Sequence, residues 1–100
     1  MNIAIKRGAT FRARVQMDTG LKGWNFTSKA RLGSVKTFLN NLTCREIDVD
    51  GACVIEIECP TDNWPTMVVI IDIRAEQNGE VILGETIQVS VSREVTDGSD

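Results

Sequence analysis

The chain of 100 residues contains no histidine and no tyrosine, and only five of its residues are aromatic. Without histidine, neither a Ser-His-Asp triad nor a Cys-His pair can form. A structural zinc site is disfavoured as well, because the sequence also has no Cys-x-x-Cys pair. We therefore expect no enzymatic activity, no metal and no cofactor.

Cysteine is scarce and odd in number, with Cys44, Cys53 and Cys59. An odd number does not suggest a disulfide framework. If Cys53 and Cys59 share one extended strand, their Cα atoms lie about 20 Å apart, which is too far for a bridge. We interpret all three as small core residues.

The sequence also lacks a long apolar run and an excess of basic residues. No stretch approaches the roughly 20 apolar residues of a membrane span, and the opening "MNIAIKRGAT" has no apolar signal-peptide core. The net charge of -3 argues against general nucleic-acid binding. We expect synthesis in the cytoplasm, with no membrane and no nucleic-acid partner. The densest basic group is interpreted as a solvated strand face: Lys6, Arg7, Arg12 and Arg14.

Alternation of apolar and polar residues with a period of two is the dominant pattern, and it is typical of half-buried β-strands. Two-residue hairpin turns are predicted at Asp50-Gly51 and Asn78-Gly79. About seven or eight short strands separated by turns predict one all-β domain over residues 1–96, either a β-sandwich or a small β-barrel. Residues 97–100 form a polar tail. The predicted strands lie in residues 10–17, 24–33, 45–49, 52–59 and 67–76, and residues 80–95 are predicted to hold a pair of strands with Ile87, Val89, Val91 and Val95 inward.

Two segments are harder to interpret. Residues 35–43 fit both a helical and an alternating spacing, and we favour a strand or an irregular stretch. Pro60 is expected to end the strand before it, because proline cannot donate to the ladder. Thr61 or Asp62 is then expected to cap a turn or a single helical turn.

The segment "TDNWPTMVVIIDIR", residues 61–74, is apolar at nearly every position from Met67 to Ile71. Continuous apolarity indicates burial on both faces. Val68 and Ile70 are the outward apolar positions of this strand and form a candidate partner interface. Either a second layer of the same domain or a partner protein covers them.

Asp72 and Arg74 follow on the face opposite Ile71 and Ile73. An acid and a base two residues apart on a strand pair with cross-strand neighbours. Lys6, Arg93 and Glu94 are the expected partners, and the pairing has a structural role.

Other candidate sites rest on single features. A turn and a proline flank Trp64, which makes it a candidate for stacking on a sugar, with Trp24 as a second ring; the alternative is that Trp64 plugs the core. Glu56 and Glu58 lie about 7 Å apart on one strand face and could act as acid and base, but alternation explains them as a solvated face.

The "DVDG" segment, residues 48–51, faintly resembles a calcium loop. It lacks the third ligand position and the distal glutamate. A hairpin turn is the favoured interpretation.

The order of several segments resembles small virion-associated β-domains of tailed bacteriophages, such as baseplate and receptor-binding-protein adaptors and the N-terminal module of the upper baseplate protein. The segments are "IKRGATF", "DTG", "GWNFTSKARLG", "DVDGACVIEIECPTDNWPTMVVIIDIRAE" and "NGEVILGETIQVSVSREVT", and they extend from Ile5 to Thr96. Two positions depart from the pattern: Ala9 stands where aspartate is common, and Thr66 stands where glycine often follows Trp-Pro.

The resemblance implies an immunoglobulin-like sandwich with an assembly role and no reaction. The leading expectation is a virion protein that contacts other tail, baseplate or capsid proteins, with self-association possible. A capsid decoration protein that stabilises the head is one alternative. A carbohydrate or host-receptor binding module is another.

Overall fold

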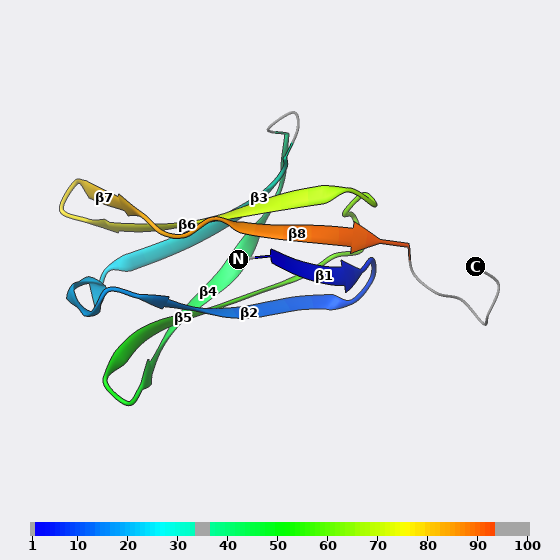
Figure 1. Ribbon diagram of the computed structural model, residues 1–100. Coiled ribbons are helices and arrows are strands. Elements are labelled where there is room, and N and C mark those ends of the chain that lie inside the picture. The colour runs from blue at the N-terminus through cyan, green and yellow to red at the C-terminus, as the bar shows by residue number, and fades with distance from the viewer. Residues whose placement is uncertain (1, 34–36, 94–100) are drawn as a thin grey trace.

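The computed structural model describes residues 2–33 and 37–93. Nearly all of this part of the chain is β-structure (Figure 1), which confirms the all-β prediction. The elements in chain order are β1 (Asn2–Lys6), β2 (Thr10–Met17), the short 3-10 helix η1 (Thr19–Leu21), β3 (Asn25–Leu32), β4 (Phe38–Val49), β5 (Ala52–Pro60), β6 (Val68–Gln77), β7 (Glu80–Leu83) and β8 (Ile87–Ser92).

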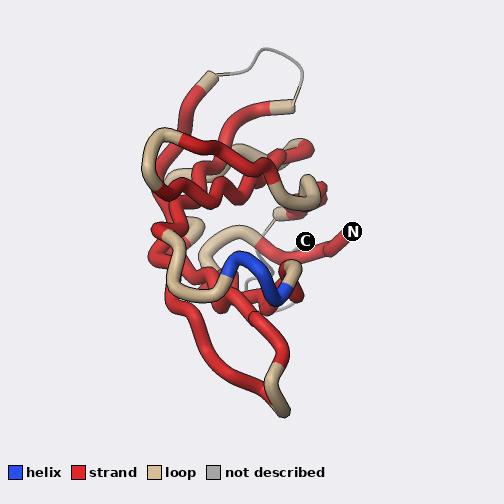
Figure 2. Tube along the Cα trace, turned by 90° about the vertical axis from the view of Figure 1, so that its left-hand side faces the viewer, coloured by secondary structure: helices blue, strands red, loops and turns tan. Residues whose placement is uncertain are grey.

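The strands form two packed layers that share strand β4. Sheet A has the order β1-β8-β6-β3-β4, with β7 paired to the second half of β6. Sheet B has the order β4-β5-β2. Residues 38–42 of β4 pair with β3, and residues 43–49 pair with β5. Figure 1 shows β4 between β3 and β5, and Figure 2 shows the strands gathered into an upper and a lower group. The result is an immunoglobulin-like sandwich that is nearly barrel-like, because one strand belongs to both layers.

The first strand was not among those predicted, and its direction differs from that of the other strand pairs. β1 pairs parallel to β8, whereas every other described strand pair is antiparallel. Five residues with only Ile3 and Ile5 half-buried give too short an alternation to identify a strand. No hairpin joins β1 to β8, which lies at the other end of the chain, so a parallel pairing is compatible with the connection from β1 into sheet B.

Thr61 holds the connection between β1 and β2 in place. Its buried hydroxyl donates to the carbonyl of Ala9 at 2.6 Å and accepts the N–H of Gly8 at 3.0 Å. Gly8 has a φ of 94°, a conformation that favours glycine. Of the two alternatives expected at Thr61 and Asp62, the turn is observed and the single helical turn is not. A turn without a helix follows β5, and the Thr61 side chain is directed to the β1–β2 connection.

Most other boundaries agree with the prediction. β2 spans the predicted residues 10–17, and β5 ends at Pro60 as expected. Residues 38–43 lie within β4, which is a strand, whereas 35 and 36 lie outside the described residues. The two strands predicted over 80–95 are present as β7 and β8, although each pairs with β6, and Val95 lies outside the described residues.

Both predicted hairpin turns are present. The central residues have positive φ in each: 52° at Asp50 and 84° at Gly51, then 51° at Asn78 and 83° at Gly79. Two successive positive φ values are those of a type I′ turn, whose twist matches the flanking strands. The turns set the registers of β4 with β5 and of β6 with β7.

The core lies between the two sheets. Sheet B contributes alternate residues of β2 and β5, and sheet A contributes those of β6 and β8. The rings of Phe11 and Trp64 meet there with centroids 5.8 Å apart. Each of these strands therefore directs its other set of side chains to an outer face of the sandwich. The largest fully buried aliphatic side chains among the described residues are Ile55, Ile57, Val69, Ile71, Ile73, Ile87 and Val89.

Candidate functional site

A groove of about 1040 Å³ runs over the outer face of sheet A, along β3, β4, β6 and β7. Phe38 of β4 and Leu83 of β7 lie at its two sides, and both are unusually exposed, at 55% and 73%. Phe38 lies opposite Arg31 in the ladder of β3 with β4, and Leu83 lies opposite Arg74 in that of β6 with β7. The groove therefore has apolar sides and a charged middle.

The charged middle consists of ion pairs. Arg31 Nε donates to Asp72 Oδ2 at 2.9 Å, and Thr86 Oγ1 lies 3.4 Å from the other oxygen of Asp72. Arg74 donates to Glu76, two residues along the same strand, at 2.7 Å. These partners replace the expected Lys6 and Arg93, and the third expected partner, Glu94, lies outside the described residues. β3 rather than β1 lies beside this half of β6, and the order of strands in the sheet cannot be read from one strand's pattern.

Val68 and Ile70 lie on this same outer face, opposite Ser90 and Gln88 of β8. Sheet B packs against the other face of β6, so it does not cover them. Ile70 is half-buried and lies close to Gly33, whereas Val68 is exposed. A covering partner for this pair stays a prediction.

Strand β7 exposes all four of its residues. Val81, Ile82 and Leu83 are large and apolar, yet none of them is buried. β7 pairs with β6 on one side and with no other described strand. The β6–β7 hairpin extends to the end of the molecule opposite the end of β8 (Figure 1). Sequence reasoning missed this edge, although the uninterrupted apolar run "VIL" beside the Asn78-Gly79 turn was a visible signal.

Trp64 is the clearest correction among the candidate sites. Its side chain is 1% exposed, packs on Phe11, and donates its indole N–H to Asn40 at 3.0 Å. A ring enclosed in this way offers no face to a sugar, so the interpretation as a core plug is the one observed. Trp24 is half-buried against the same core.

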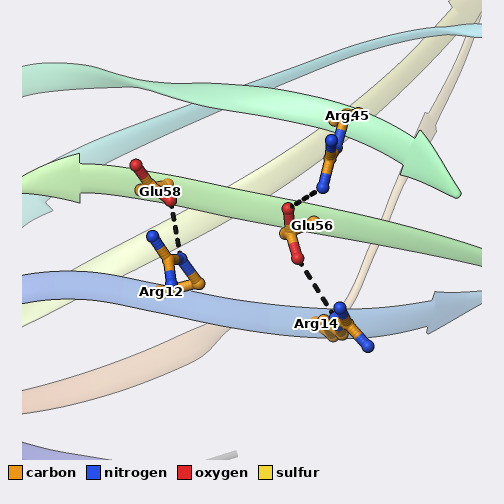
Figure 3. A network of polar contacts seen from close by, with 5 residues as sticks. All are labelled: Arg12, Arg14, Arg45, Glu56 and Glu58. Atoms are coloured by element: carbon orange, nitrogen blue, oxygen red, sulfur yellow. Dashed lines mark hydrogen bonds and ion pairs between the residues drawn. The ribbon is translucent and has the colours of Figure 1, made fainter.

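The outer face of sheet B carries a ladder of charges (Figure 3). Glu56 accepts from Arg14 at 3.1 Å and from Arg45 at 2.5 Å. Arg12 donates to Glu58 at 2.6 Å. These residues come from three adjacent strands, β2, β5 and β4, whose registers place them side by side. Arg12 and Arg14, two of the four residues in the densest basic group of the sequence, are thus cross-strand partners of Glu58 and Glu56.

The electrostatics of this ladder do not suit acid catalysis. The hydrogen bond from Arg14, followed by that from Arg45, holds the pKa of Glu56 below its ordinary value. A catalytic acid at neutral pH needs a raised pKa instead. The ladder is therefore best described as cross-strand pairing that fixes the register of sheet B.

The three cysteines are free thiols. Burial raises the pKa of Cys44, Cys53 and Cys59, which lowers the fraction of reactive thiolate. Over residues 2–33 and 37–93, no group of three or more acidic or cysteine side chains is placed to hold a metal ion. Asp48 Oδ1 accepts the N–H of Gly51 at 2.8 Å, so the carboxylate of the calcium-like segment stabilises its own hairpin turn.

Comparison with known proteins supports the fold. The chain is similar to the structure of the BTLA ectodomain, with a TM-score of 0.63 and 13% identity over 90% of this chain and 88% of that one. It is also similar to the second Ig domain of the mouse polymeric immunoglobulin receptor, with a TM-score of 0.55 and 5% identity over 97% of this chain and 100% of that one. No family model matches the chain, and neither does any curated protein. The two structural similarities show that the fold is immunoglobulin-like. Within the described segments, no helix is long and apolar enough to cross a membrane.

Proposed function

We propose that the chain is a non-catalytic binding domain of a tailed-bacteriophage virion, attached to the tail, baseplate or capsid by protein contacts. The observation that carries the proposal is the uncovered apolar group on sheet A. Phe38, Val68, Val81 and Leu83 are exposed on its outer face or at its edge. Large apolar side chains that a domain leaves uncovered favour contact with another protein.

The charges around this group support binding rather than chemistry. Arg31 with Asp72, and Arg74 with Glu76, already neutralise one another in the groove. A partner that covers these two pairs meets charges that already compensate one another, and burying them costs less than burying the same ions singly. Outside the groove, Glu56 is held as an anion between two arginines, which supports the absence of an acid catalyst.

The virion setting rests on the order of the sequence segments from Ile5 to Thr96, which resembles virion-associated domains. The immunoglobulin-like sandwich is compatible with that setting, although a fold by itself does not specify a function. A tail or baseplate adaptor and a capsid decoration protein use the same kind of surface. They differ in copy number and in the particle component they contact.

The direct test is mass spectrometry of purified particles produced by the virus or prophage that encodes the chain. We expect the chain in the particles at a fixed number of copies per major capsid protein. Separation of heads from tails before the measurement assigns it to one component. Absence from purified particles, while the infected cells contain the chain, would overturn the virion setting.

The binding surface is tested with Phe38→Glu, which places a charge beside the groove. The matched control is Val49→Glu, another exposed apolar residue at the far end of the same strand. We expect Phe38→Glu to reduce recovery of the added chain with particles at least about tenfold, whereas the control binds like the wild type. Equal recovery of both variants would exclude the groove as the contact.

The catalytic alternative has its own test. A panel of hydrolase substrates should give no turnover with the wild-type chain. Turnover that Glu56→Gln abolishes would show that the domain is an enzyme.

A further inference from the structure

We propose that a second copy of the chain pairs with the free edge of β7, strand to strand and antiparallel, about a two-fold axis that passes beside Ile82. This inference deepens the proposed function, on which it rests, since it names a partner of the apolar surface of sheet A. The two copies would join their sheets A into one continuous sheet.

The free hydrogen-bonding groups of β7 can be identified from its pairing with β6. Gly84 N donates to Ile73 O at 2.8 Å. In an antiparallel ladder, the residues whose backbone groups point at the partner alternate along the strand. Ile82 therefore points its N–H and C=O toward β6, as Gly84 does. Val81 and Leu83 point theirs outward, where no described strand receives them.

These outward groups are self-complementary. A two-fold axis beside Ile82 places Val81 opposite Leu83 of the other copy, and the reverse, as two hydrogen-bonded pairs. Ile82 then faces its own symmetry mate as the non-hydrogen-bonded pair between them. Four backbone hydrogen bonds result, and every outward N–H and C=O of Val81 and Leu83 has a partner in this register.

The side chains match as well. Val81 and Leu83 of both copies lie together on the outer face, and the two Ile82 side chains meet on the inner face. Glu80 faces Gly84 of the other copy, so no like charges are directly opposed. The large exposed apolar side chains on both faces of β7 are covered by one another.

Three other free sheet edges, those of β1, β2 and the second half of β4, are less suited to pairing. β2 carries Arg12 and Arg14, β4 carries Arg45 in its second half, and β1 carries Lys6. Charged side chains on an edge strand oppose edge-to-edge association. β7 has apolar side chains at three of its four positions, and every one of them is exposed. A second copy is favoured as the occupant because this short sequence complements itself.

The first experiment measures the mass of the intact wild-type chain by sedimentation equilibrium over a wide concentration range. A contact this small belongs to the weak class of interfaces, so we expect monomers and dimers in exchange on the order of 0.1 mM. Val81→Pro removes an outward N–H, and Leu83→Lys places a charge in the contact; both should leave a monomer at every concentration. Met67→Lys, the same charge at an exposed apolar residue off the edge, should dimerise like the wild type. Circular dichroism checks that each variant folds.

The second experiment tests the register by oxidation. Cα atoms of a non-hydrogen-bonded antiparallel pair are about 4.5 Å apart, which a disulfide can bridge. Ile82→Cys should therefore form a covalent dimer at least about tenfold faster than Leu83→Cys, whose mate lies opposite Val81. The wild type, with its three native thiols, is the background control.

Two results would overturn the proposal. One is a wild-type monomer at all concentrations together with equal, slow crosslinking of both cysteine variants, which would assign the edge to a strand of a different protein. The other is a dimer that Val81→Pro and Leu83→Lys leave intact, which would place the contact elsewhere. Neither result bears on whether the chain is present in virus particles, so the two proposals fail separately.

Discussion

The indole N–H of Trp64 donates to Oδ1 of Asn40 at 3.0 Å, and this bond joins the turn after β5 to strand β4. The Trp64 side chain is almost entirely buried, and Asn40 Oδ1 is the acceptor that the described structure provides for its Nε1. A buried donor without a partner costs far more free energy than a made hydrogen bond contributes.

Asn40→Ala should therefore lower the free energy of unfolding by about 1–3 kcal/mol. The measurement is urea denaturation followed by tryptophan fluorescence. Asn41→Ala is the control, because this neighbouring side chain is exposed and its loss should change stability by no more than about 0.5 kcal/mol. Equal effects of the two substitutions would show that the bond to Trp64 does not matter for stability.

Substitution of Ser28 by alanine, unlike that of Asn40, should not reduce the stability of the domain. Its hydroxyl is buried in sheet A, and no described residue bonds to it. Ser28→Ala removes a polar group that has no partner, so the free energy of unfolding should stay the same or rise by up to about 1 kcal/mol. Ser90→Ala on the exposed face of β8 is the reference. A clear loss of stability in Ser28→Ala alone would mean that the hydroxyl is bonded in solution.

Glu56 should make the domain sensitive to acid. Its folded pKa lies below the ordinary value because of hydrogen bonds from Arg14 and Arg45. A depressed folded pKa gives stability that is present above the unfolded-state pKa of about 4.3 and is lost as the pH falls through the folded pKa. Glu56→Gln should therefore flatten the dependence of unfolding free energy on pH in this acid range.

Urea denaturation at a series of pH values from neutral to strongly acidic tests this expectation. Asp62→Asn is the control, since Asp62 has no ion-pair partner among the described residues, and its curve should follow the wild type. NMR titration of Glu56 in Arg14→Gln should show its pKa moving upward. An unchanged pKa in that variant would contradict the assigned cause.

The thiols should react slowly in the folded state. Burial raises the pKa of Cys44, Cys53 and Cys59, so little thiolate is present at neutral pH. Cys44 is only half-buried and should react first with an aromatic disulfide reagent, at a rate that increases with pH. Three thiols should react rapidly in urea. A single fast thiol at pH 7 that survives Cys44→Ser would contradict this order.

Local patterns were sufficient to predict which side chains face inward. The alternation of residues 10–17 and 52–59 identified β2 and β5 almost to the residue, because inward and outward positions are set by the strand itself. The Asp50-Gly51 turn similarly predicted the register between the two strands that it joins, β4 and β5. Such features depend on neighbours a few residues apart.

Features that depend on the order of strands could not be predicted in the same way. Asp72 pairs with Arg31 because β3 lies beside β6, and one strand's sequence does not determine its neighbour. The burial of Trp64 likewise depends on Phe11 and Asn40, which lie far away in the chain. The candidate site was the part least predictable from the sequence, because the groove and the β7 edge form only when the strands of sheet A come together.

Strand β4 has a consequence for how the molecule unfolds. It supplies an outer strand to sheet A with residues 38–42 and to sheet B with residues 43–49. Disruption of either sheet therefore removes the hydrogen-bonding partner of one half of β4. Because the strand is continuous, the other half and the sheet to which it belongs are destabilised as well. We expect the two layers to melt in a single cooperative transition, with coincident loss of tryptophan fluorescence and β-sheet circular dichroism. Refolding should be slow for a domain of this size, in the millisecond-to-second range, because so many of its pairings join residues distant in the chain.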